Sequence, residues 1–239
     1  MAAMAADAHA AADFYSTTRG AVAARLLRER LLEMWPDLRG QSVLGIGFAA
    51  PYLRLWRSQA ARCIAVTPAQ MGATRWPLGE PCLSCTAEED ALPFADLSFD
   101  RVILVHGLEA AENARRLLRE TWRVLKDDGR LLVAAPNRAG VWAYVEQTPF
   151  GHGQPYSFGQ LGRLLAASLY RVERRGTVLW VPPVGPRLML RSAQLFERAG
   201  RRLMPGMAGV IVSEAVKDVY AAMPLKPVPR RRLVTTEAA

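Results

Sequence analysis

The chain has 239 residues, of which 51% are hydrophobic, and a formal net charge of +9. This length and apolar content are typical of one packed α/β domain and exclude an intrinsically disordered protein. No apolar run approaches the roughly 20 residues of a membrane-spanning helix, and the acid-containing first segment lacks the basic start of a signal peptide, so we expect a soluble cytoplasmic protein without a membrane contact.

The positive charge comes almost wholly from arginine, since Lys126, Lys217 and Lys226 are the only lysines. The arginines are spread along the chain, and only residues 230–232 form a compact cluster. A basic composition without a nucleic-acid-binding motif indicates a solvated basic surface, so we do not expect a nucleic-acid partner.

The three cysteines, Cys63, Cys82 and Cys85, are too few for a disulfide framework. Cys82 and Cys85 have CxxC spacing, but the scattered histidines do not supply the two further ligands that zinc needs. We therefore interpret the cysteines as structural and expect no metal site.

The first part of the chain predicts a disordered end, two helices and three strands. Residues 1–12 are rich in alanine, and we expect them to be disordered. Apolar residues recur every three or four positions from Phe14 to Met34, which predicts an amphipathic helix that ends near Pro36. Short apolar segments at 42–46, 63–66 and 83–86 predict strands, and a second helix is expected to start at Pro51.

Residues 91–137 contain a complete strand–helix–strand unit. Apolar segments at 99–105 and 131–135 predict two strands. Between them lies an amphipathic helix, which we expect to end at the turn formed by residues 127–129. Two continuous apolar strands separated by a helix predict a parallel sheet that is covered on both faces.

The last part of the chain predicts two helices and two strands. A helix begins after Ser157, which has capping-box spacing with Gln160. A strand follows at 171–181, then a helical stretch at 188–203 and a final strand at 209–217. Residues 182–207 are more than a hairpin needs, so we treat them as an insertion, and the basic, Pro-rich residues 224–239 predict a mobile tail.

The unit at 91–137 closely resembles the second half of class I S-adenosylmethionine-dependent methyltransferases, in particular those of type 11. The resemblance rests on the phrases LPF and SFD and on a helix that ends in RVLK-x-x-G, in this order. It implies a Rossmann-like α/β fold over residues 13–223, with helices on both faces of a seven-stranded, mostly parallel sheet. It also implies S-adenosylmethionine as the cofactor.

The resemblance assigns cofactor contacts to the ends of the first three strands. These positions are Gly45, Gly47, Ala49, Thr67, Ala87 and Glu88. Family members usually carry an acid where this chain has Gly45, Thr67 and Thr86, so we expect weaker cofactor binding than in such relatives. The run from Gly45 to Ala50 also fits the dinucleotide pattern G-x-G-x-x-A, but Thr67 stands where a nicotinamide site needs an acid, so an oxidoreductase is less well supported.

Four more residues are candidates for the site. Tyr15 precedes the body of the first helix and is expected either to close over the cofactor or to anchor the helix. His106 ends the fourth strand, where it can line the cofactor pocket or act as a general base. His152 and Tyr156 lie in a loop rich in Gly and Pro, and we expect them either to face the substrate as catalytic residues or to pack the turn.

These observations predict a methyltransferase that acts on an unknown small-molecule or protein acceptor. The alternative is a catalytically weak or inactive relative that serves as a binding or regulatory module. The insertion at 182–207 is rich in Met and Leu, so it can form a substrate lid, a face for a protein partner or an ordinary helix of the core.

Overall fold

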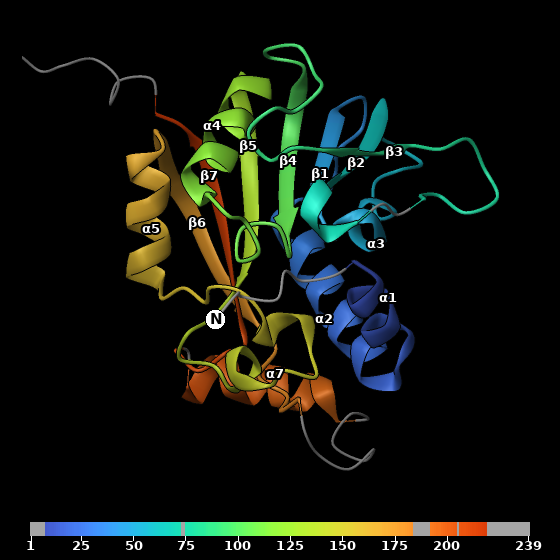
Figure 1. The fold of residues 1–239 in the computed structure, drawn as a ribbon. Coiled ribbons are helices and arrows are strands. Elements are labelled where there is room, and N and C mark those ends of the chain that lie inside the picture. Colours follow the sequence, from blue (N-terminus) through green and yellow to red (C-terminus); the bar gives the residue numbers. More distant parts are fainter. Residues whose placement is uncertain (1–7, 73–74, 184–191, 205, 219–239) are drawn as a thin grey trace, which may run out of the picture.

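A computed structural model of the protein describes residues 8–72, 75–183, 192–204 and 206–218. These residues form one seven-stranded sheet with helices packed around it (Figure 1). The strands are β1 (Ser42–Gly47), β2 (Arg62–Pro68), β3 (Ser84–Ala87), β4 (Phe99–Val105), β5 (Leu125–Pro136), β6 (Tyr170–Val178) and β7 (Val210–Lys217). The α-helices are α1 (Ala8–Ser16), α2 (Thr18–Met34), α3 (Ala50–Leu53), α4 (Ala114–Val124), α5 (Phe158–Ala167) and α7 (Ala193–Leu203). Short 3₁₀ turns are η1 (Ala69–Met71), η2 (Val141–Tyr144) and η3 (Pro149–Gly151).

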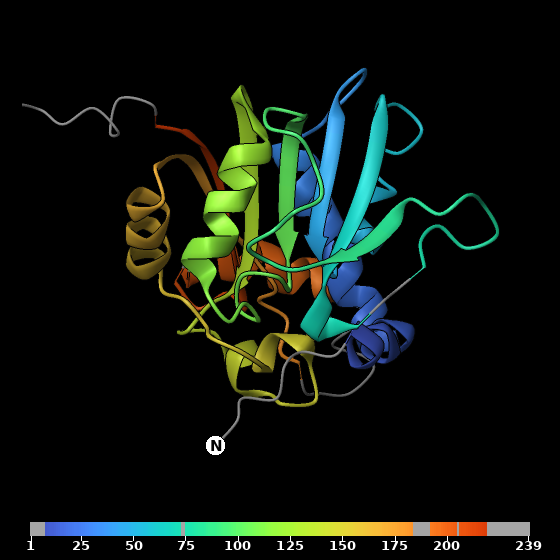
Figure 2. The same cartoon turned by 45° about the horizontal axis from the view of Figure 1, so that its top comes forward.

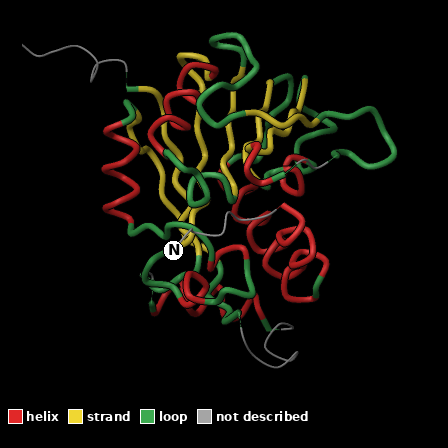
Figure 3. Tube along the Cα trace, in the orientation of Figure 1, coloured by secondary structure: helices red, strands yellow, loops and turns green. Residues whose placement is uncertain are grey.

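The strands follow the order β3-β2-β1-β4-β5-β7-β6 across the sheet. The pairs from β3 to β5 are parallel, whereas β7 runs antiparallel to both β5 and β6. Figure 3 shows these strands as one continuous layer with helices on both sides. The predicted seven-stranded, mostly parallel sheet with an antiparallel last strand is confirmed.

Successive side chains of each strand point to opposite faces of the sheet, which divides the core into two layers. Val43 packs with residues of α2, α3 and α7 on one face, while Leu44 and Ile46 pack with α4 and α5 on the other. Figure 2 shows α4 in front of the sheet and α2 and α7 behind it. Both faces of the parallel strands are thus buried, as their continuous apolar sequences require.

The N-terminal region forms two helices instead of the single helix that we predicted. Thr17 separates them, because its side chain accepts a hydrogen bond from the Gly20 backbone N–H and caps the start of α2. Residues 8–12, expected to be disordered, form the first turns of α1, with Ala8 and Ala11 buried. That expectation is wrong because tertiary burial stabilises this segment. Residues 1–7 lie outside the described residues.

The predicted turn at 127–129 does not end α4. The helix ends at Val124, and β5 begins directly at Leu125. β5 pairs with β4 first at Leu125 and again from Arg130, so residues 127–129 form an irregularity within the strand. The apolar core of the strand at 131–135 is as predicted.

The C-terminal elements largely follow the prediction. Ser157 and Gln160 form the expected capping box at the start of α5. In the insertion, α7 buries Ala193, Glu197 and Gly200, and Leu195 remains 65% exposed. Phe196 packs against the core, so only part of the predicted apolar stripe is ordinary core. Residues 184–191, 205 and the tail lie outside the described part.

None of the helices in the described segments is long and apolar enough to cross a membrane.

Glu214 on β7 joins three neighbouring elements through its buried carboxylate. It accepts hydrogen bonds from Arg174 on β6, from Arg130 on β5 at 2.9 Å, and from the Trp35 indole at 3.2 Å. Burial by itself raises the pKa of this carboxyl, but the hydrogen bonds from Arg174, Trp35 and Arg130 outweigh burial and hold the pKa below its usual value. The antiparallel end of the sheet is therefore tied to the end of α2.

We expect Glu214→Gln to lower the free energy of unfolding at neutral pH by roughly 1.5–3 kcal/mol, because hydrogen bonds to a charged group are lost. Because the pKa of Glu214 is lower in the folded protein, its carboxylate stabilises the fold at pH values above the unfolded pKa of about 4.3. This stabilisation is lost as the pH falls through the pKa of the folded state. Urea unfolding at pH 7 and at steps from about pH 5 to 3 measures both effects. The deficit of the variant should shrink in acid.

Glu173→Gln is the matched control, because Glu173 also pairs with Arg130 but is part-exposed. A surface pair contributes roughly 0–1 kcal/mol. An equal loss in the two variants, or a loss in Glu214→Gln that does not change with pH, would contradict the role given to Glu214.

Candidate functional site

The order of the strands reverses between β1 and β4, because β1 leads to β2 on one side and pairs with β4 on the other. Ligands of open α/β sheets bind beyond the carboxyl ends of the strands at such a reversal. We call the loops that follow β1, β2 and β4 the ligand edge. Of the predicted site residues, Gly47, Ala49, Thr67 and His106 lie in or next to these loops.

The loop after β1 is packed directly against the loop after β4. Gly47 has a φ of +85°, and a Cβ atom there would lie 2.4 Å from the Val105 carbonyl oxygen and 2.7 Å from the Gly107 nitrogen. The Phe48 N–H donates to the same Val105 oxygen at 2.8 Å. Only glycine fits at position 47, and the two loops are joined backbone to backbone.

Gly45 is neutral for a steric reason. A Cβ atom at Gly45 would lie 2.8 Å from the Cβ of Ala49 and 2.9 Å from the Cδ1 of Leu53. Helix α3 therefore approaches β1 so closely that the carboxylate expected in relatives has no room. Gly45 and the buried Ala49 pack α3 against the strand, and their predicted contact with a cofactor stays a prediction.

The ends of β2 and β3 present few charges toward the ligand edge. Thr67 is buried at the end of β2 and pairs in register with Thr86, while Ala87 ends β3. Glu88 is exposed, so the structure does not turn this predicted contact inward. Cofactor roles for Thr67, Ala87 and Glu88 stay predictions.

The acid that turns inward near β3 is Glu89. Its Oε1 accepts the Asn113 backbone N–H at 2.7 Å, and its Oε2 accepts the Glu112 N–H at 3.2 Å and the Gln70 amide at 3.0 Å. Glu89 thereby ties the segment after β2 to the start of α4. The sequence reasoning missed it, because no local pattern distinguishes it from the neighbouring Glu88.

A buried chain of hydrogen bonds crosses the ligand edge. The Tyr52 hydroxyl donates to the Tyr15 hydroxyl at 2.9 Å, the Tyr15 oxygen lies 2.7 Å from His106 Nε2, and His106 Nδ1 lies 3.1 Å from Glu109 Oε1. His106 is 1% exposed and Glu109 is 3% exposed. Four side chains from α1, α3 and the loop after β4 thus form one polar unit inside the protein.

The direction of the chain follows from its first bond. With Tyr52 as the donor, the Tyr15 proton is available to His106 Nε2, and in the matching tautomer of His106 the Nδ1 proton points to Glu109. Burial raises the pKa values of Tyr15 and Tyr52 well above the usual range of a phenol. Both hydroxyls therefore keep their protons at neutral pH.

Glu109 and His106 have features that the rest of the chain does not explain. The second carboxylate oxygen of Glu109, Oε2, is buried without a hydrogen-bond partner among the described residues. His106 has a φ of +54°, in the left-handed region that a non-glycine residue rarely adopts. A strained backbone and an unpaired buried carboxylate oxygen at a ligand edge are typical of functional sites.

Aromatic rings enclose the polar chain. Tyr15 stacks on Phe48 at a centroid distance of 5.5 Å, and Phe150 contacts the His106 ring at 4.6 Å. The loop at 148–157 therefore reaches His106 through Phe150. Its predicted site residue His152 is half-buried and is not brought to His106 by any contact in the described residues.

Tyr156 lies at the end of β5 and is 5% exposed. Its backbone N–H donates to Pro136 at 2.9 Å, which holds the loop against that strand. Burial, with a smaller contribution from the Glu109 carboxylate, raises the pKa of Tyr156 to about 12. Tyr156 is therefore near the polar chain, whereas a catalytic role for Tyr156 or His152 stays a prediction.

Helix α1 covers the ligand edge. Its residues Ala8 and Ala11 form a buried apolar cluster with Phe48 from the loop after β1 and Met71 from the segment after β2. Tyr15 and Ala110 pack against this cluster. The ends of β1, β2 and β4 are thus closed by an N-terminal helix, and the contact of Tyr15 with a cofactor stays a prediction.

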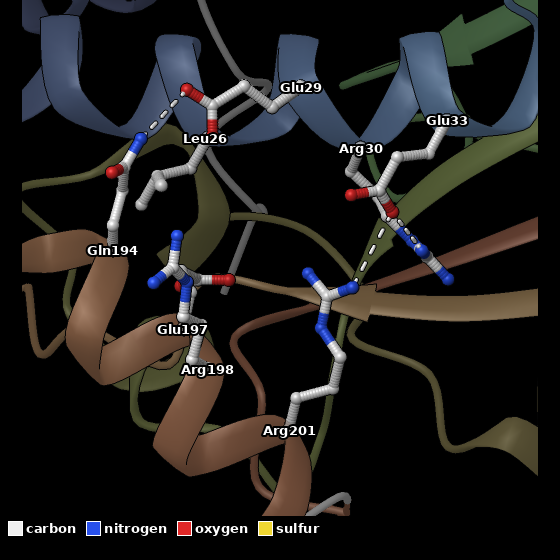
Figure 4. A pocket seen from close by; sticks show the side chains of 8 residues that line it. All are labelled: Leu26, Glu29, Arg30, Glu33, Gln194, Glu197, Arg198 and Arg201. Atoms are coloured by element: carbon white, nitrogen blue, oxygen red, sulfur yellow. Dashed lines mark hydrogen bonds and ion pairs between the residues drawn. The ribbon is translucent and has the colours of Figure 1, made fainter.

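A separate groove of about 370 Å³ lies between α2 and α7 (Figure 4). Its polar side chains bind one another. Gln194 donates to Glu29 at 3.5 Å, and both Arg30 and Arg201 form ion pairs with Glu33. This groove joins two helices behind the sheet, and its charges are largely neutralised internally. We do not consider it a ligand site.

The described segments contain no group of three or more His, Cys, Asp or Glu side chains that could hold a metal ion.

We expect Gly47→Ala to destabilise the fold more than Gly72→Ala. Both glycines have a φ of +85°, but a Cβ atom at Gly72 meets nothing within 4 Å. A backbone of positive φ costs a residue with a side chain roughly 1–3 kcal/mol at either position, and the clash at Gly47 adds about 1–3 kcal/mol. Urea unfolding of the two variants measures the difference, and equal losses would show that the two loops separate freely.

Residues 42–133 match a family model that describes a methyltransferase domain. Uncharacterized proteins of Mycobacterium tuberculosis and Mycobacterium bovis are 29% identical over 145 residues, which cover 58% of this chain and 48% of theirs. The chain thus spans about half the length of these curated relatives. A ubiquinone/menaquinone biosynthesis C-methyltransferase of Klebsiella pneumoniae is 47% identical over 47 residues, covering 20% of this chain and 19% of the relative.

Solved structures share the fold at low sequence identity. A chain in the complex of the Haloferax volcanii Trm112 methyltransferase activator with a methyltransferase has a TM-score of 0.63 at 18% identity, covering 88% of this chain and 96% of that chain. A methyltransferase of Aquifex aeolicus that depends on S-adenosylmethionine has a TM-score of 0.58 at 17% identity, with coverages of 88% and 98%. Together with the strand order, these structures show that the protein has the fold of such methyltransferases, and its residues 42–133 match the model of a methyltransferase domain.

Proposed function

We propose that the protein is an S-adenosylmethionine-dependent methyltransferase in which His106 and Glu109 form a buried acid–base pair. The observation that supports this proposal most strongly is the hydrogen-bonded chain from Tyr52 to Glu109 at the ligand edge. A neutral imidazole whose Nδ1–H is held by a carboxylate has a basic Nε2, which is the arrangement of a general base.

The residues at the ligand edge fit the cofactor. Gly47 lets the backbone of the loop after β1 turn tightly against the loop after β4, where a Cβ atom would clash, and so shapes the edge at which the cofactor is expected. The unpaired Glu109 Oε2 offers a buried carboxylate oxygen that can accept a hydrogen bond from a hydroxyl or ammonium group of the cofactor. We therefore expect Gly47 and Glu109 to hold the cofactor, together with the Thr67 hydroxyl at the end of β2.

When bound, S-adenosylmethionine supplies an electrophilic methyl group on a sulfonium. The protein's part is then to position the acceptor, exclude water and take up its proton. His106 Nε2 is the atom that can receive this proton, because Nδ1 is already bonded to Glu109. In the conformation described here Tyr15 occupies Nε2, so Tyr15 must withdraw for His106 to act.

Helix α1 is part of this proposal because it carries Tyr15 and covers the ligand edge. Movement of α1 would open the edge and free His106 in one step. The acceptor itself is not identified by these residues.

We expect His106→Asn to slow methyl transfer by a factor of about 10²–10⁴, the usual contribution of a general base, while the affinity for S-adenosylhomocysteine changes only a few-fold. Formation of S-adenosylhomocysteine in the presence of fractionated small-molecule extracts measures transfer, and calorimetric titration measures affinity. His152→Asn is the control, because His152 is not brought to the polar chain. A large loss in His152→Asn with none in His106→Asn would move the catalytic assignment to the loop.

The neutral positions Gly45, Thr67 and Thr86 imply weak cofactor binding. We expect Thr67→Asp to tighten S-adenosylhomocysteine binding several-fold, because a carboxylate forms stronger hydrogen bonds to ribose hydroxyls than a threonine hydroxyl does. Asp does not fit at Gly45, so Gly45→Asp should lose stability and gain no affinity. Calorimetry combined with thermal unfolding separates the two results, and an unchanged affinity in Thr67→Asp would show that the ribose lies elsewhere.

A role as a binding or regulatory module is the second candidate function. The supporting observation is that four apolar side chains of the insertion, Leu195, Leu203, Met204 and Met207, are each at least half exposed. The similar methyltransferase of Haloferax volcanii was solved with a protein activator. Loss of a co-purifying protein in Leu195→Ser, with S-adenosylhomocysteine binding intact, would favour this role.

A further inference from the structure

A second groove, of about 450 Å³, lies between α4 and α5. It is lined by Ala114, Arg115, Gln154, Tyr156, Gln160, Arg163, Leu164 and Ala167. A volume of this size falls within the range of roughly 300–1,000 Å³ that is typical of small-molecule sites. The groove lies on the opposite face of the sheet from the groove between α2 and α7.

The charge of the groove is positive and unbalanced. Arg115 and Arg163 form no ion pair or hydrogen bond with any residue that the structure describes, and none of the eight lining residues is acidic. The α2–α7 groove is different, because there Arg30 and Arg201 both meet Glu33. The α4–α5 groove therefore has two guanidinium groups available for an anion.

Both helices add to this positive potential. α4 and α5 follow β4 and the segment after β5, so each begins at the carboxyl end of the sheet. Arg115 lies in the first turn of α4, and the Arg163 guanidinium reaches back over the first turn of α5, where a Cβ atom at Gly159 would lie 3.3 Å from its Nη1. The N-terminal end of a helix carries a partial positive charge, so the arginines and the helix ends both favour a negatively charged ligand.

Tyr156 provides an independent indication of a ligand. Its side chain is nearly buried and lines the groove, yet its hydroxyl forms no hydrogen bond to any described residue. With a pKa raised to about 12, the hydroxyl remains a donor at neutral pH. The hydroxyl is thus the part of a nearly buried side chain that is open to the groove, beside two arginines that have no acidic partner among the described residues.

The groove is also close to the polar chain at the ligand edge. The Gln154 backbone N–H donates to the Glu109 carbonyl at 2.9 Å, and Gln154 and Tyr156 line the groove. A molecule in the groove can thus extend toward Glu109 and His106.

We propose that the α4–α5 groove binds the anionic group, a carboxylate or a phosphate monoester, of a small-molecule methyl acceptor. Arg115 and Arg163 bind the anion, Tyr156 donates a hydrogen bond to it, and Leu164 and the two alanines contact the apolar body. The assignment of this ligand as the methyl acceptor rests on the proposed function, whereas binding of an anion in the groove does not.

Nuclear magnetic resonance titration with phenyl phosphate, benzoate and neutral benzyl alcohol tests the proposal. We expect at least one of the two anions to bind and to shift the signals of Arg115, Tyr156 and Arg163, with benzyl alcohol binding much more weakly. Arg115→Gln and Arg163→Gln should each weaken binding about tenfold, the effect of one charge-assisted hydrogen bond. Arg163→Lys should recover part of this loss, and added salt should weaken binding.

Arg202→Gln is the matched control, because Arg202 is an exposed arginine on α7. Binding that is preferential for phenyl phosphate or for benzoate supports the proposal and identifies the anion. Equal binding of benzyl alcohol, or equal losses in Arg202→Gln and Arg163→Gln, would overturn it. Displacement of the small anions by a single-stranded oligonucleotide of much higher affinity would also overturn it in favour of a nucleic acid.

Titration of the same variants with S-adenosylhomocysteine separates the two proposals. If the protein binds S-adenosylhomocysteine but no anion, the proposed anion site in the α4–α5 groove is rejected, while the proposed methyltransferase function is not. Anion binding in a protein that never binds S-adenosylhomocysteine would reject the methyltransferase and leave an anion site. Thermal unfolding checks that the arginine variants are folded, which their exposed positions favour.

Discussion

The contact between the loops after β1 and β4 determines the arrangement of the whole ligand edge. Because position 47 has no side chain, the backbone of the first loop lies against the Val105 carbonyl and Gly107. This approach brings both Phe48 and His106 to Tyr15, which stacks on the first and forms a hydrogen bond with the second. A side chain at position 47 would push the two loops apart. It would thereby break these two contacts of Tyr15 and interrupt the hydrogen-bonded chain from Tyr52 to Glu109.

The acids of the ligand edge lie in loops rather than at the ends of the first three strands. Close packing of α3 leaves no room for a side chain at Gly45. Glu89 and Glu109 instead carry buried carboxylates at the same edge, one ordering the start of α4 and the other holding His106. Negative charge is thus retained near the reversal in strand order, but its location differs from that expected of relatives with the full set of acids.

The fold could be predicted from the sequence because its strongest signals are local. The β4 segment is a continuous apolar run between polar turns, and its predicted bounds at 99–105 match the structure. The start of α5 was equally predictable from the capping box of Ser157 and Gln160. The first turns of α1 were missed, because alanines give no apolar stripe and their burial depends on Phe48, which is distant in sequence.

The site was less predictable because its partners come together only in the folded chain. His106 and Tyr15 were recognised from their positions, yet their direct bond spans 91 residues and has no local signal. Tyr52 and Glu89 were missed for the same reason, although a tyrosine after Pro51 at the ligand edge is a signal that could have identified the first. In the loop at 148–157 we predicted His152 as a site residue because of its chemistry, whereas the ring that contacts His106 belongs to Phe150.

The small side chains of α1 also determine how easily the ligand edge opens. Ahead of Phe14 the helix contributes only the methyl groups of Ala8 and Ala11 to the buried cluster. Burial of one such group is worth about 0.8 kcal/mol, so the two together contribute only about 1.6 kcal/mol. A helix end held by an energy of this size unwinds and re-forms spontaneously. The first turns of α1 are therefore the weakly held part of the cover, whereas Phe14 and Tyr15 fasten its other end through the core and through the bond to His106.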